Sequence, residues 1–107
     1  HFNLFIANAA HARGLAVALK NDLEQIDTLG ASFDFAVNEQ CHELDECDGY
    51  NAFLASGKAV FNAEYASAYV QNTGGARDSL CRSAKAAQIR TLVLPQALDD
   101  SFRFSCD

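Results

Sequence analysis

The sequence predicts one α/β domain, residues 1–107, in which about four parallel strands alternate with helices. Short apolar runs recur along the chain, and runs of this length are typical of strands buried on both faces of a parallel sheet. Between them lie segments whose apolar residues are spaced as on one face of a helix. Strands of one sheet that are joined by helical crossovers run parallel, so the pattern indicates repeated β/α units.

The composition supports a folded domain and excludes some partners. A chain of 107 residues, 50% of them hydrophobic, can bury a core. The formal net charge of −6 argues against nucleic acid and anionic membranes, both of which require basic patches. No apolar stretch approaches the roughly 18 residues of a membrane-spanning helix. The sequence shows no phosphate-binding glycine motif, nucleophile elbow or zinc-protease motif, so we expect no cofactor and no metal.

The chain is predicted to begin with a helix that ends at Gly14, because glycine commonly terminates helices. The apolar residues of this segment recur at i, i+3, i+4 and i+7: Phe2, Phe5, Ile6 and Ala9. The unbroken apolar run that follows, residues 15–19, predicts a buried strand.

Lys20, Asn21 and Asp22 follow this first strand. Asp22 and Gln25 have the spacing of a capping box, and the sequence leaves open whether Asp22 caps a helix or contacts a substrate. The helix that starts here is predicted to stop at Gly30. A lysine that closes a buried strand is poorly placed for solvent, so we expect Lys20 to meet a carboxylate or a substrate hydroxyl.

The central strand is predicted over residues 33–38, and Glu39 follows it directly. In parallel α/β folds the chemistry gathers beyond the carboxyl ends of the strands, which makes Glu39 the candidate catalytic acid. The next loop carries four carboxylates between two cysteines. It lacks the ligand order and the glycine of an EF-hand, so we predict a solvated acidic loop rather than a calcium site.

The rest of the chain continues the alternation. The predicted elements are a helix over residues 50–56, a strand over 58–65, a long loop over 67–76, a helix over 77–88, a strand over 89–94 that Pro95 closes, and a tail over 96–107 with a short helical turn. Long loops over strand ends often hold substrates.

Polar residues end three of the strands, in the triplets Lys20-Asn21-Asp22, Asn38-Glu39-Gln40 and Asn62-Ala63-Glu64. The carboxyl ends of parallel strands lie at one edge of a sheet, so we expect these side chains to converge. Two carboxylates about 5–9 Å apart can hydrolyse a glycosidic bond. We predict Glu39 as catalytic, Glu64 as the one second acid that we can name in the chain, and as substrate-binding residues Lys20, Asn21, Asp22, Asn38, Asn62 and Glu64. Helix caps and structural hydrogen bonds are the alternative for the same residues.

Four cysteines, Cys41, Cys47, Cys81 and Cys106, allow two disulfides in any of three pairings. Pairing of nearest neighbours would staple the acidic loop and tie the tail to the last helix. Free thiols are an alternative, and so is zinc, although the spacing from Cys41 to Cys47 exceeds that of a usual zinc-binding pair. Disulfides imply an oxidising compartment, so we expect a secreted, extracellular protein.

Several of these segments resemble glycoside hydrolase family 114, the endo-α-polygalactosaminidase-like proteins. They are the strand that leads into Lys20-Asn21-Asp22, residues 33–41, Asp45-Glu46-Cys47, and residues 57–62 leading to Glu64-Tyr65. The resemblance implies a secreted (β/α)₈ TIM barrel that acts on galactosamine-containing polysaccharides. It implies Glu39 as the catalytic glutamate, the predicted substrate-binding residues as cleft positions, and the pairings Cys41–Cys47 and Cys81–Cys106.

The resemblance covers the C-terminal half of the family's barrel. We therefore expect the chain to need a partner, either the missing N-terminal half, which carries the family's catalytic aspartate, or a second copy, and we expect the isolated chain to be inactive. Leu94 and Pro95 stand where such proteins tend to have a lysine and an aspartate, a difference that weakens the substrate pocket or marks a divergent member. The alternatives are a non-catalytic secreted module that binds glycan or protein through the same edge, and a doubly wound α/β domain.

Overall fold

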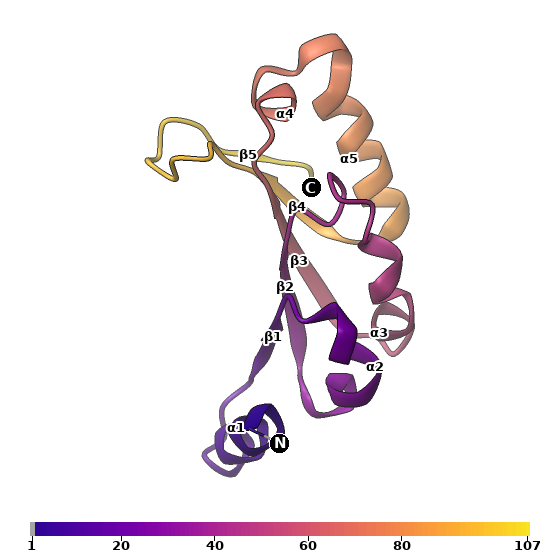
Figure 1. The fold of residues 1–107 in the computed structure, drawn as a ribbon, viewed down its shortest axis with the longest axis vertical. Helices are drawn as coiled ribbons and strands as arrows, with labels where there is room; N and C mark the ends of the chain where they lie inside the picture. Colours follow the sequence, from indigo (N-terminus) through magenta and orange to yellow (C-terminus); the bar gives the residue numbers. More distant parts are fainter. Residues whose placement is uncertain (1) are drawn as a thin grey trace.

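The computed structural model describes residues 2–107 as a twisted sheet with helices packed on one face (Figure 1). The sheet has five strands in the order β1-β2-β3-β4-β5. Their bounds are β1 Ala18–Lys20, β2 Phe35–Glu39, β3 Ala59–Glu64, β4 Arg90–Val93 and β5 Phe104–Ser105. The first four strands are parallel and β5 is antiparallel to β4. The predicted parallel α/β fold is confirmed, and the tail contains β5 in place of the predicted helical turn.

Helical segments precede the first strand and join the parallel strands, as the spacing of apolar residues predicted. They are α1 Phe2–Ala12, η1 Leu23–Gln25, α2 Ile26–Leu29, η2 Gly30–Ser32, η3 Cys47–Tyr50, α3 Asn51–Ala55, α4 Ser67–Gln71, η4 Thr73–Gly75 and α5 Ala76–Ala87. The helix α1 ends as predicted before Gly14, whose φ of +72° is the left-handed conformation common after a helix end. The segment predicted as a long loop contains the short helix α4 instead.

The strand order and the placement of the helices are those of part of a (β/α) barrel. Each parallel strand lies beside the next one in the chain, and α2, α3 and α5 all cover the same face (Figure 1). A doubly wound domain reverses its strand order and places helices on both faces. Residues 2–107 show no such reversal, so the doubly wound alternative is wrong.

The core lies between the sheet and these helices. Leu19, Ala36, Val60 and Val93 come from four successive strands and are at least 96% buried. They contact the helical segments through a cluster that includes Ile26, Leu29 and Phe53 and through a second one around Leu80. Side chains alternate between the two faces of a strand. The residues between these core positions must therefore face the opposite side.

That opposite face of the sheet, called the open face below, has no helical layer (Figure 1). Phe35 and Phe61 meet on it edge to face, with ring centroids 5.9 Å apart, and Phe61 is 42% exposed. The predicted apolar stripe of α1 is also uncovered, since Phe2 and Phe5 are 75% and 65% exposed. The first strand begins only at Ala18, three residues later than predicted, and the preceding apolar residues do not join the sheet.

The two disulfides pair nearest neighbours, which confirms the predicted arrangement. Cys41 bonds Cys47 across the loop after β2, and Cys81 on α5 bonds Cys106 in the tail. Of the helices in residues 2–107, none is long and apolar enough to cross a membrane.

Candidate active site at the carboxyl ends of the strands

Glu39 ends β2 at the edge of the sheet where the parallel strands finish, which we call the rim. Lys20, the last residue of the neighbouring strand β1, places its Nζ 3.0 Å from Oε1 of Glu39. The backbone N–H of Glu39 donates to Oδ1 of Asn21 at 2.9 Å. Lys20 thus meets a carboxylate, one of its two expected partners, and Lys20, Asn21 and Glu39 do converge at the rim.

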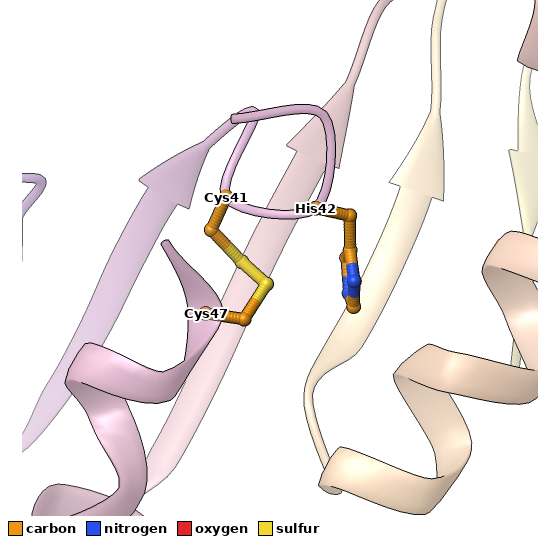
Figure 2. Close-up of side chains that lie close together, drawn as sticks. All are labelled: Cys41, His42 and Cys47. Carbon is orange, nitrogen blue, oxygen red and sulfur yellow. A yellow bond between two sulfur atoms is a disulfide. The ribbon is translucent and has the colours of Figure 1, made fainter. Parts of the chain in front are cut away.

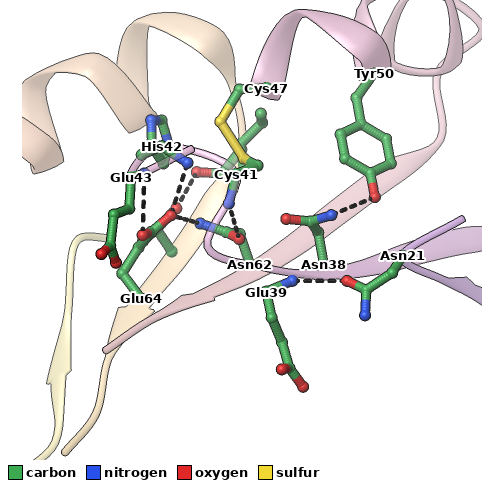
Figure 3. The surroundings of a disulfide bond; sticks show 12 residues. Asn21, Asn38, Glu39, Cys41, His42, Glu43, Cys47, Tyr50, Asn62 and Glu64 are labelled. Atoms are coloured by element: carbon green, nitrogen blue, oxygen red, sulfur yellow. Dashed lines mark hydrogen bonds between the residues drawn. A yellow bond between two sulfur atoms is a disulfide. The ribbon is translucent and has the colours of Figure 1, made fainter. Parts of the chain in front are cut away.

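The other predicted site residues of β2 and β3 lie on the helix-covered face. Asn38, Asn62 and Glu64 are 2%, 4% and 0% exposed. Figure 3 shows the Glu39 side chain pointing to one side of the sheet and these three side chains to the other. Alternation along a strand explains the division, because Asn38 and Glu39 are adjacent residues. Buried side chains cannot contact a substrate as we expected. Their burial fits the alternative, in which these residues make structural hydrogen bonds.

Glu64 anchors the loop that follows β2. Its Oε2 accepts hydrogen bonds from the backbone N–H of His42 and from Nδ2 of Asn62, both at 2.8 Å, and its Oε1 accepts from the N–H of Glu43 at 3.3 Å (Figure 3). Asn62 Oδ1 in turn accepts from the N–H of Cys41 at 3.4 Å. The tip of β3 thereby holds three consecutive amides of the loop. A buried carboxylate requires such donors, since burial without them is costly.

Asn38 supports a different neighbour. Its Nδ2 donates to the hydroxyl of Tyr50, the last residue of η3, at 2.9 Å. Burial raises the pKa of the Tyr50 phenol, so Tyr50 stays protonated at neutral pH. This bond ties the core beneath the disulfide loop to the strand that carries Glu39.

Asp22 lies beside the rim without the predicted capping bond. It adopts left-handed backbone angles, φ 52° and ψ 42°, and its side chain makes no cap to η1. Instead its Oδ2 accepts from Nδ2 of Asn3 at 3.3 Å, which links α1 to the loop after β1. Asn21 is also left-handed, and Asn and Asp tolerate that conformation better than other residues. The capping alternative for Asp22 is wrong, because left-handed angles at the N-cap position differ from the extended angles from which a side chain caps a helix.

Cys41, His42 and Cys47 lie together in the loop after β2, with their ligand-type atoms within 4.8 Å of one another (Figure 2). Zinc binds cysteine as the thiolate, and the two sulfurs here are joined in a disulfide. The proximity of these three residues therefore reflects the disulfide and does not indicate a zinc site. Burial lowers the pKa of the His42 imidazole, although the charge of Glu64 acts in the opposite direction.

Three neighbouring hollows border Glu39. One of about 290 Å³ also involves Tyr65, one of about 360 Å³ opens along Val37 and Phe61, and one of about 410 Å³ lies beside Asn21. Tyr65, one residue beyond β3, borders two of them. Burial raises the pKa of its phenol, and the charge of Glu39 raises it further. The sequence did not single out Tyr65 as a site residue, although its place directly after a strand end could have indicated it.

The fold and the rim define a partial (β/α) barrel whose strand ends present a carboxylate beside several hollows. The chain belongs to glycoside-hydrolase family GH114, whose model matches residues 1–107. A crystal structure of Aspergillus fumigatus Ega3 in complex with galactosamine is similar, with a TM-score of 0.80 and 34% sequence identity. The match covers 95% of this chain and 42% of the Ega3 chain. The comparison with curated proteins gives no match.

Proposed function

We propose that this chain is the C-terminal half of a secreted glycoside hydrolase that cleaves a galactosamine-containing polysaccharide, with Glu39 as one carboxylate of its catalytic pair. The observation that carries the proposal is the position of Glu39. It ends a barrel strand, borders three hollows and belongs to a GH114 chain. The galactosamine in the similar Ega3 structure supports the substrate class.

The chemistry requires two carboxyl groups on opposite sides of the bond that breaks. One protonates the leaving oxygen, while the other attacks the anomeric carbon or activates a water molecule. Glu39 would supply one of these functions, with Lys20 holding its Oε1. Glu64, the second acid that the sequence offered, is fully buried on the other face. Glu64 is thereby excluded, and we expect the second carboxylate in the half of the barrel that this chain does not contain, as the resemblance to the family implies.

The open face supports the need for that other half. It carries Phe35 and Phe61, and the exposed side of α1 adds Phe2 and Phe5. An uncovered apolar sheet face and an unpaired β1 edge promote association in water. We expect the isolated chain to associate, and light scattering during size-exclusion chromatography would measure this. A stable monomer at micromolar concentration would count against the half-barrel.

Secretion is supported by the two disulfides, Cys41–Cys47 and Cys81–Cys106, which persist in oxidising compartments. The mass of the intact protein isolated from culture medium, before and after reduction, tests both parts of this proposal. Reduction should add four hydrogens to the peptides that contain Cys41, Cys47, Cys81 and Cys106. Protein found only inside the cells, with reduced thiols, would refute secretion.

Replacement of the proposed acid in the complete barrel that contains residues 1–107 tests the function. Glu39→Gln should lower turnover of a galactosamine polymer by about 10²–10⁴-fold. Asp48→Asn is the matched control, because Asp48 is an exposed carboxylate that borders none of the three hollows beside Glu39. Mass spectrometry of the released oligosaccharides gives the readout. Full activity of Glu39→Gln would refute the assignment, and turnover by the isolated chain would refute the requirement for the other half.

A non-catalytic glycan-binding module is the second candidate. It is favoured by one observation, that the strand-end acids Glu39 and Glu64 of this chain face opposite sides of the sheet. Binding of a galactosamine oligomer by the complete barrel, without cleavage, would establish this candidate in place of the hydrolase.

A further inference from the structure

A hollow of about 290 Å³ lies at the rim beside Glu39. Three segments form it: the loop after β2, the residues that follow β3, and the segment between β4 and β5, called the arm below (residues 94–103). Glu43 and Tyr65 border it from the first two segments, and Leu98 borders it from the arm. The hollow thus combines a carboxylate, a phenol and an aliphatic side chain next to the proposed catalytic acid.

The carboxylate of Glu43 has no cationic partner among residues 2–107. Glu39 differs, because its Oε1 lies 3.0 Å from Lys20 Nζ. The side-chain contact of Glu43 is with Gln40, whose Nε2 lies 3.4 Å from Oε2, a long and therefore weak hydrogen bond. Glu43 is exposed. Its negative charge is thus available to a cation that enters the hollow.

The backbone of Glu43 is nevertheless held in place. Its N–H donates to the buried Glu64 carboxylate at 3.3 Å, and the N–H of His42 donates to the same group at 2.8 Å (Figure 3). The disulfide between Cys41 and Cys47 closes the loop around them. Fixed backbone positions reduce the entropy that a charged side chain loses when it binds a ligand.

Leu98 supplies an apolar wall from the arm. It is 61% exposed and has a φ of +53°, a conformation that leucine rarely adopts. A turn in which its N–H donates to the carbonyl of Pro95 at 2.9 Å supports this conformation. An exposed aliphatic side chain beside polar groups matches a sugar ring, which presents C–H groups on its faces and hydroxyls at its edge.

We propose that this hollow is a subsite for an amino-sugar unit next to the bond cleaved, and that Glu43 recognises the free 2-ammonium group of that unit. The inference rests on the proposed function and adds a residue that sets its specificity. A free hexosamine amine is cationic at neutral pH, whereas an N-acetylated one is neutral. A carboxylate pairs with the first through charge-assisted hydrogen bonds and gains no such bond with the second.

Binding to an inactive complete barrel tests this role without cleavage of the ligand. In the Glu39→Gln background, calorimetry would compare a galactosamine tetramer with its fully N-acetylated form. Adding Glu43→Gln should weaken binding of the free-amine tetramer at least tenfold and leave that of the acetylated tetramer within twofold. Glu43→Asp should restore part of the preference, and Asp48→Asn should leave it unchanged.

The possible results separate this inference from the proposed function. An equal loss for both tetramers would mean that Glu43 acts in folding or in contacts that do not involve the amine, and no loss for either would mean that it does not contact the amine. Both results overturn the inference while the hydrolase proposal stands. If neither tetramer binds and the unsubstituted barrel cleaves no galactosamine polymer, the proposed function is refuted together with the inference.

Discussion

Lys20 and Glu39 form an ion pair across two neighbouring parallel strands, with Nζ of Lys20 3.0 Å from Oε1 of Glu39. Their side chains are 63% and 37% exposed, so the pair lies at the surface of the rim. Surface pairs contribute about 0–1 kcal/mol to the free energy of unfolding. The effect of this pair should therefore be on the orientation of the Glu39 carboxylate rather than on stability.

Loss of Lys20 should reduce catalysis without unfolding the protein. We predict that Lys20→Met lowers kcat of the complete barrel about tenfold, because a carboxylate that rotates freely is oriented correctly for less of the time. The free energy of unfolding should change by less than about 1 kcal/mol. Lys85→Met on α5 removes an exposed lysine far along the chain and serves as control. Equal kcat values for the two variants would contradict the orienting role.

Glu64 should contribute strongly to the free energy of unfolding, although it lies outside the proposed catalytic pair. Glu64→Gln replaces one of the two acceptor oxygens with an NH₂ group, which must face either the amide of Glu43 or both the amide of His42 and the side chain of Asn62, all of them donors. We predict a loss of about 2–4 kcal/mol in the free energy of unfolding, measured with urea. Hydrogen exchange at the amides of residues 42 and 43 should also accelerate. Unchanged exchange at both amides would show that the carboxylate does not hold the loop.

The contrast between Glu39 and Glu64 shows how far the sequence predicts this site. Both residues end short apolar strands, and from that pattern the parallel β/α units and the meeting of the strand ends at one edge follow, whereas the barrel type was implied by the family resemblance. The pattern does not give the face to which each side chain points, because a run buried on both sides lacks the alternation of polar and apolar residues. It does require Asn38 and Glu39 to face opposite sides, because they are adjacent residues of one strand.

Other features depended on tertiary context. Asp22 has the spacing of a capping box and stands at the N-cap position of η1, but the chain adopts left-handed angles at Asn21 and Asp22 and the Asp22 side chain makes no capping bond. Tyr65 and Leu98 reach the rim from segments that are distant in sequence from Glu43. The hollow that they form requires the arm between β4 and β5, which carries no periodic signal in the sequence.

The two disulfides should differ in their contribution to stability. Cys81–Cys106 closes a sequence separation of 25 residues and Cys41–Cys47 one of 6. In the chain-entropy model, the first should contribute roughly 3 kcal/mol and the second roughly 2 kcal/mol. We therefore predict that Cys81→Ser/Cys106→Ser lowers the free energy of unfolding more than Cys41→Ser/Cys47→Ser does, by about 1 kcal/mol. Urea titrations of both double variants measure this, and the reverse order would mean that the loop after β2 depends on its staple for more than chain entropy.

Stability should fall in mildly acidic solution because of His42. Burial lowers the pKa of its imidazole below the ordinary 6.5, so the unfolded chain takes up a proton at a higher pH than the folded protein does. The contribution of neutral His42 is complete above pH 6.5 and declines as the pH falls from 6.5 towards the folded pKa.

The variant His42→Gln tests this origin. It should flatten the slope of unfolding free energy against pH, measured in urea between about pH 5 and 8, where histidine is the side chain that ordinarily titrates. The carboxylate of Asp34 is a separate case, because His11 and the N–H of Val17 lower its pKa below 3.8 and its contribution is lost only at still lower pH. A slope that is identical in His42→Gln and the unsubstituted protein would assign the acid sensitivity to another group.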